Sequence, residues 1–90
     1  MNLAVESDDA DPELRDAARN AMSRLIGLFE RVIGEGIEQG EFSRGDVRAR
    51  ASLIVASVEG GVMLSNLYKD RAHMDAVLDH LKQMVQMGFR

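Results

Sequence analysis

Residues 46–68 contain the feature that most constrains the fold, a predicted helix with two apolar sides. At about 100° per residue, its apolar side chains gather on two nearly opposite faces. The first face carries Val47, Ala51, Ile54, Val58 and Val62, and the second carries Ala49, Leu53, Ala56, Gly60, Met63 and Leu67. A helix that is apolar on two sides is buried on two sides. The other helices of a short chain can cover one side, so we expect a second subunit to cover the other.

The preceding segment predicts a long helix over residues 12–39. Asp11 is suited to capping free amides, Pro12 to the first turn, and Glu13 to the positive end of the helix dipole. Gly40 offers an end. The expected apolar stripe consists of Leu14, Ala18, Ala21, Leu25, Leu28, Phe29, Val32 and Gly36, widened by Met22, Ile26 and Ile33.

The last helix is predicted over residues 71–87, with Asp70 as its cap and Gly88 as its end. It is amphipathic, with one stripe made of Met74, Val77, Leu78, Leu81, Met84 and Val85. The expected fold is therefore all-α: a single domain over residues 1–90 with three helices, the last two of which form a four-helix bundle with a second subunit. Within the middle helix, Gly60 and Gly61 together sacrifice about 2 kcal/mol of helix propensity, which indicates close approach by a neighbouring helix.

Length and composition narrow the functional classes. A chain of 90 residues buries too little surface to be comfortably stable alone, which also favours a homodimer. The net charge of −4 argues against direct binding of a polyanion such as DNA. The absence of cysteine is compatible with the cytoplasm, and the nearly uncharged run over residues 51–66 is short for a membrane span. We therefore expect a cytoplasmic protein with no membrane partner.

Two sets of candidate site residues follow from these patterns. The expected dimer interface comprises Ile54, Val58, Gly61, Val62, Ser65, Met74, Val77, Leu78, Leu81 and Val85. The second set begins with Ser52, Glu59 and Asn66, which form a polar seam spaced by sevens along the middle helix. An unpaired buried carboxylate is unfavourable, so Glu59 must reach solvent, a partner or a ligand. The seam is either a wet interface edge or one side of an effector cavity, whose expected ligand-binding residues are Met22, Phe29, Glu59 and Met63.

His73 and His80 are the remaining candidates for chemistry. They lie seven residues apart, whereas chelation on a helix favours a separation of three or four, so packing or solvation explains them better than a metal. The sequence contains no acid and base pair, nucleophile triad, phosphate loop or cofactor fingerprint. We expect no catalytic residue, no metal and no cofactor, and hence no enzyme.

The chain resembles the C-terminal half of TetR-family transcriptional regulators. The most specific match is the opening Asn2-Leu3-Ala4-Val5-Glu6 followed by Asp11-Pro12-Glu13-Leu14-Arg15. A long helix ending at residues 38–42, an apolar helix containing residues 51–61 and a final amphipathic helix continue the resemblance over essentially the whole chain.

The resemblance implies a domain that dimerises through its last two helices and binds a small hydrophobic effector. In that family, a separate N-terminal helix-turn-helix domain reads DNA, and no such domain is recognisable in this sequence. DNA is therefore expected as a partner only through a module outside this sequence. A free-standing homodimeric helical protein that acts by protein–protein association is the alternative.

Overall fold

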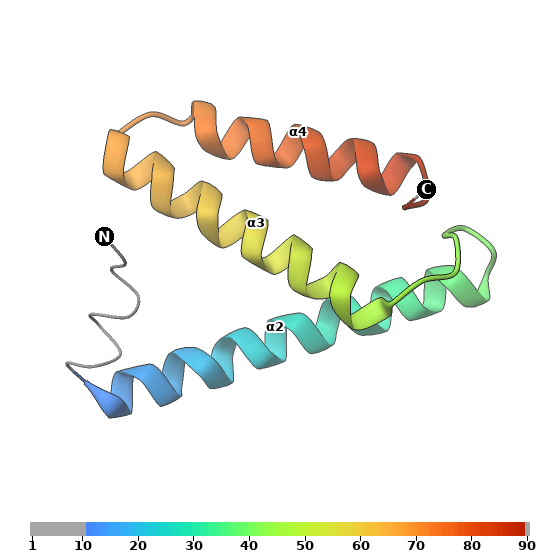
Figure 1. The fold of residues 1–90 in the computed structure, drawn as a ribbon, viewed down its shortest axis with the longest axis horizontal. Helices are drawn as coiled ribbons and strands as arrows, with labels where there is room; N and C mark the ends of the chain where they lie inside the picture. Colours follow the sequence, from blue (N-terminus) through green and yellow to red (C-terminus); the bar gives the residue numbers. More distant parts are fainter. Residues whose placement is uncertain (1–10, 90) are drawn as a thin grey trace.

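The computed structural model of the protein describes residues 11–89, and in this range it contains three α-helices and no β-strand. Helix α2 spans Pro12–Glu38, α3 spans Val47–Tyr68 and α4 spans Ala72–Gln86 (Figure 1). The predicted all-helical class is confirmed for these residues. The residues 2–6 that opened the family resemblance lie outside the described range.

The helix starts follow from capping carboxylates. The side chain of Asp11 accepts a hydrogen bond from the Leu14 amide at 3.1 Å, and that of Asp46 accepts one from the Ala49 amide at 3.0 Å. Both caps were predicted, and each satisfies an amide that has no partner within its helix. The third prediction was wrong in detail, because α4 has Arg71 at its N-cap position. Asp70 lies one residue before that position, and its side chain accepts a hydrogen bond from the Ala72 amide at 2.9 Å.

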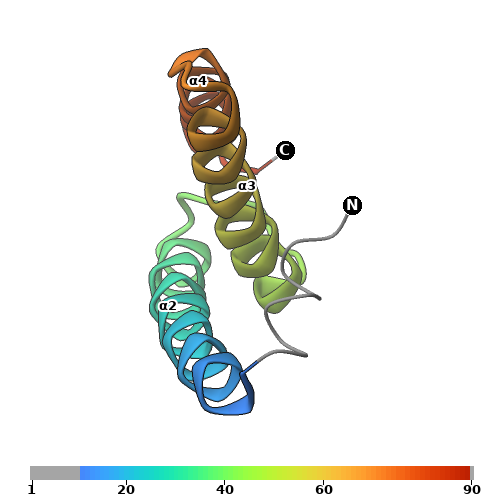
Figure 2. The same ribbon diagram turned by 90° about the vertical axis from the view of Figure 1, so that its left-hand side faces the viewer.

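Helix α3 lies between the other two and packs against both, whereas α2 and α4 do not pack against each other (Figures 1 and 2). The fold measures 45 × 29 × 16 Å. Because α2 and α4 each pack against α3 and not against each other, the three helices form one curved layer (Figure 2). Such a layer leaves both of its faces open.

The core is small and lies where α2 crosses α3. Its buried centre consists of Ile33, Ala51 and Ile54, and Val55 is buried nearby. The predicted stripe of α2 was displaced, because its widening residues Ile26 and Ile33 face the core while Leu28 and Val32 are 55% and 57% exposed. Leu14 is also exposed. Helix α3 covers only one flank of the wide apolar arc of α2, and the other flank stays on the surface.

The close approach predicted at the glycine pair occurs at one of the two glycines. A Cβ atom added to Gly61 would lie 3.1 Å from both the Met74 sulfur and a Val77 methyl, which places the backbone of α3 directly against α4. Gly60 has no neighbouring atom within 4 Å of such a Cβ. The hydroxyl of Ser65 accepts a hydrogen bond from the Met74 amide at 3.1 Å and joins the same two helices.

The end of the described chain is tied to the corner between α2 and α3. Ser43 donates from its amide to the Gly88 carbonyl at 2.9 Å and from its hydroxyl to the Phe89 carbonyl at 3.2 Å. The guanidinium of Arg50 donates to Ser43 and lies 4.9 Å from the centre of the Phe89 ring. Phe42 meets the same ring edge to face, with centroids 5.0 Å apart. This C-terminal clasp fixes the end of α4 near the end of α2.

Candidate functional site

An open apolar groove of about 440 Å³ lies where the three helices face one another. Phe29 of α2 forms one wall, and α3 contributes Ile54 and Val58. The other wall belongs to α4 and consists of Leu78, Leu81, Lys82, Val85 and Gln86. The groove exists because α2 and α4 each contact α3 but do not meet each other.

The groove is aliphatic and aromatic except at one edge. Leu78 and Val85 are 47% and 44% exposed, so much of their surface is available to an occupant. Lys82 is the one charged residue among those that line the groove, and Gln86 lies one helical turn further along α4. Lys82 forms no ion pair with any of the described residues. The edge therefore carries a positive charge and amide hydrogen-bond donors beside an apolar surface.

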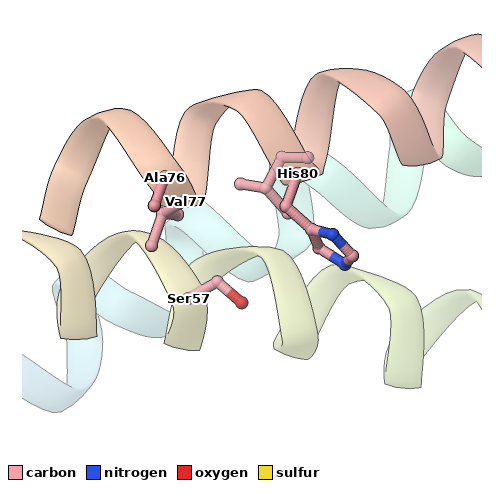
Figure 3. Close-up of a pocket in the computed structure, with 5 residues that line it drawn as sticks. Ser57, Ala76, Val77 and His80 are labelled. Atoms are coloured by element: carbon pink, nitrogen blue, oxygen red, sulfur yellow. The ribbon is translucent and has the colours of Figure 1, made fainter. Parts of the chain in front are cut away.

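A second, smaller hollow of about 260 Å³ lies between α3 and α4 and is lined by Ser57, Ala76, Val77, His80 and Leu81. We call it the Ser57 pocket. Figure 3 shows Ser57 on α3 and His80 extending from α4 toward α3. The side chain of His80 is exposed.

The groove and the Ser57 pocket open on opposite sides of the contact between α3 and α4. At about 100° per residue, Val77 and His80 fall on one side of Leu81, and Leu78 and Val85 fall on the other. Leu81 itself lines both hollows. Because Phe29 lines only the groove, α2 lies on the groove side.

The second apolar face of α3 is not covered by α2 or α4, the other helices of residues 11–89. Ala51 and Ile54, on the first predicted face, are buried against the neighbouring helices. Leu53, Met63 and Leu67, on the second face, are 52%, 45% and 55% exposed. The exposed Leu64 extends this surface toward the Ser57 pocket. We call these four residues the open face of α3. The structure thus identifies which side of the two-sided helix the other helices of the chain cover.

The residues expected at a dimer interface divide into three groups in the structure, with Val62 outside all three. Ile54 is in the core, while Gly61, Ser65, Met74 and Val77 join α3 to α4 of the same chain. The third group lines the groove and consists of Val58, Leu78, Leu81 and Val85, beside the core residue Ile54, which also lines it. Val62 is 43% exposed. All of these contacts lie within one chain, so the role of these residues at an interface with a second subunit stays a prediction.

The four expected ligand-binding residues do not line one cavity. Phe29 lines the groove, and Met22 is half-buried on α2 outside the set that lines it. Glu59 and Met63 are exposed, about 100° and 140° around α3 from Val58. The sequence analysis did not predict that α4 supplies a wall of the groove. The sequence feature that could have indicated it is Lys82, which flanks the apolar stripe of that helix.

The remaining polar candidates show no convergence on a chemical centre. Glu59 and Asn66 of the polar seam are exposed and Ser52 is half-buried, so the carboxylate reaches solvent. His73 lies beside Tyr68, with ring centroids 5.4 Å apart. Within residues 11–89, no group of three or more acidic or imidazole side chains is placed to bind a metal ion.

Helix α3 has the length and apolar composition of a membrane-crossing helix, with its 22 residues. The central helix of a water-soluble helical assembly meets the same two criteria, so this property alone assigns no membrane role. Its partners in this fold are α2 and α4.

Three helices in one layer, with an apolar groove on one side and the open face of α3 on the other, define an all-helical domain with two uncovered apolar surfaces. The chain belongs to the tetracyclin repressor-like C-terminal domain family, whose model matches residues 1–81. The family resemblance drawn from the sequence is thereby confirmed. No curated protein and no solved structure gives a significant match to the chain.

Proposed function

We propose that this chain is the effector-binding and dimerisation domain of a TetR-like transcriptional regulator and has no DNA-binding or enzymatic activity of its own. The family match supports the regulatory class, and the net charge of −4 disfavours direct contact with DNA. The cytoplasm is the compartment in which such a regulator meets DNA. One observation carries the proposal: α3 is apolar on two sides, and its own chain covers one of them.

A second copy of the chain covers the open face of α3 in this proposal. The four residues of that face are each between 41% and 55% exposed, and large contiguous apolar patches are unusual on monomers. Helices α3 and α4 of the two subunits then form a four-helix bundle, the packing in which side chains of one helix fill hollows on another. The Ser57 pocket lies beside the open face, and Val77 and Leu81 form part of it. Gly61, Ser65 and Met74 keep the two helices of each subunit in register.

The groove is the effector site in this proposal. Its volume of about 440 Å³ is within the range of roughly 300–1,000 Å³ that is usual for small-molecule sites. Leu81 lines both the groove and the Ser57 pocket, so a ligand that moves this side chain alters the surface that faces the second subunit. Effector binding and dimer geometry are then energetically coupled, as regulation requires.

Sedimentation equilibrium of the 9.9 kDa chain tests the association at the open face. We expect the wild type to sediment at twice the monomer mass and its melting temperature to rise with protein concentration. Leu53→Asp introduces a charge on the open face and should yield monomers. The matched control is Leu28→Asp, because Leu28 is 55% exposed against 52% for Leu53 but lies on α2.

Two results would contradict the proposal. One is a folded wild-type monomer at tens of micromolar with a melting temperature that does not depend on concentration. The other is a dimer that Leu28→Asp disrupts and Leu53→Asp leaves intact, which would place the second subunit on the groove side.

A further inference from the structure

We propose that the groove binds an apolar molecule with a single anionic head group, a carboxylate being the simplest, and that Lys82 receives the head. This inference rests on the proposed function, since it names the chemical class of the effector for the same groove. It arises from the chemical contrast between the two parts of the groove, an apolar floor and one cationic edge.

The floor requires an apolar occupant. Phe29, Ile54 and Val58 present only hydrocarbon to the groove, and the half-exposed Leu78 and Val85 would lose contact with water when it is filled. Burial of apolar surface stabilises a complex by roughly 25 cal/mol per Å² before the entropy of association is counted. A strongly polar ligand would gain none of this and would lose its own hydration.

The edge selects the charge of the head group. Lys82 and Gln86 are separated by four residues and therefore lie on the same side of α4. The ammonium group and the amide nitrogen both donate hydrogen bonds, and a carboxylate accepts several at once. Among residues 11–89, no acidic side chain lines the groove. The nearest carboxylate along α4 is Asp79, which lies one turn before Lys82 and forms no ion pair with it.

The size of the selectivity follows from solvent exposure. Lys82 is exposed, so water screens its attraction for a carboxylate, and ion pairs in such positions shift an equilibrium by about 1.5-fold to 5-fold. An anionic ligand should therefore bind more tightly than a neutral one of equal length by that factor. A cationic ligand of the same length should bind more weakly than the neutral one.

The experiment compares octanoate, octanol and octylamine as probes of the full 90-residue chain at neutral pH. Nuclear magnetic resonance titration reports both the affinity and the residues that respond. We expect all three probes to shift the methyl resonances of Leu78 and Val85, with affinity in the order octanoate, octanol, octylamine. Increasing salt should reduce the advantage of octanoate and leave the binding of octanol nearly unchanged.

Lys82→Gln removes the charge from the groove edge and should make octanoate and octanol bind equally well. Lys69→Gln is the matched control, because Lys69 is also an exposed lysine but lies at the turn between α3 and α4, outside the groove. It removes the same net charge and should preserve the preference for octanoate.

The outcomes separate this inference from the proposed function. Equal affinity for octanoate and octanol in the wild type would overturn the anionic head group and leave an effector groove in place. Groove resonances that respond to none of the probes would overturn both. If those resonances instead shift on dilution of the protein alone, a second copy occupies the groove and the inference is also overturned. Resonance shifts confined to Ser57 and His80 would show that the probes bind in the Ser57 pocket, on the opposite side of the layer, and would also overturn the inference.

Discussion

The contact between α3 and α4 predicts opposite responses at two neighbouring glycines. Replacing either Gly60 or Gly61 by alanine removes a helix-destabilising residue and contributes about 0.8–1 kcal/mol of stability from propensity alone. At Gly60 nothing in the described part of the chain lies within 4 Å of the new methyl group, so the full gain is expected for the unassociated chain. At Gly61 the methyl would lie 3.1 Å from Met74 and from Val77, closer than ordinary van der Waals contact. Met74 can adapt, but the branched side chain of Val77 is stiff, so Gly61→Ala is expected to lower the stability of the fold.

Substitution by leucine enlarges this difference. Gly61→Leu forces α4 away from α3 and should destabilise the fold by about 1–3 kcal/mol, which is usual for overpacking. Gly60→Leu meets open space among the described residues of its own chain and should retain most of its propensity gain in the unassociated chain. Urea denaturation of the four variants at one protein concentration gives the free energies of unfolding, and equal slopes show that the same surface is exposed in each. A Gly61→Leu variant as stable as Gly60→Leu would refute the close approach of the two helices. Sedimentation of the same samples separates loss of folding from loss of association.

Two further predictions concern the clasp and the core. Arg50→Met should destabilise the fold by about 1–3 kcal/mol, because it removes hydrogen bonds to Ser43 and the cation–π contact with Phe89. Amide hydrogen exchange at the end of α4 should then accelerate. Unchanged exchange there would show that the clasp contributes nothing to stability. Ile33→Ala should lower the free energy of unfolding by about 2–5 kcal/mol, because the side chain is 2% exposed. Val32→Ala, at a position that is 57% exposed, should lower it far less in the same urea denaturation experiment. Similar losses for the two variants would place the core elsewhere on α2.

The helices were predictable from local chemistry. A carboxylate that caps the first amides marks the starts of α2 and α3 at Asp11 and Asp46, and glycine in the left-handed region follows α2 at Gly40, where φ is +79°. These signals depend on residues within one turn of each helix boundary, so they can be recognised in the sequence without knowledge of the tertiary fold. The start of α4 was less predictable, because Asp70 lies one residue before the N-cap Arg71, although its side chain accepts a hydrogen bond from Ala72, the first residue of the helix.

Periodicity could not determine which part of a wide apolar arc faces a neighbour. On α2 the arc extends from Leu28 to Ile33, and the crossing position of α3 buries Ile33 and leaves Leu28 exposed. The same limitation affected α3, whose two faces have similar composition although α2 and α4 cover only one. The groove was less predictable still, since its two walls come from helices that touch α3 but not each other.

The thinness of the fold links its stability to its proposed role. A layer 16 Å deep has no interior remote from water, and twelve large apolar side chains of the described residues are exposed. Anything that covers either face of the layer therefore buries surface that the isolated chain leaves wet. Such a partner binds the folded state in preference to the unfolded chain, and at a hundred times its dissociation constant a ligand raises stability by about 2.7 kcal/mol. Because Leu81 lines hollows on both sides of the layer, the packing that one partner imposes on it changes the surface that the other meets. A one-layer fold is thus suited to converting occupancy of one face into a preference at the other.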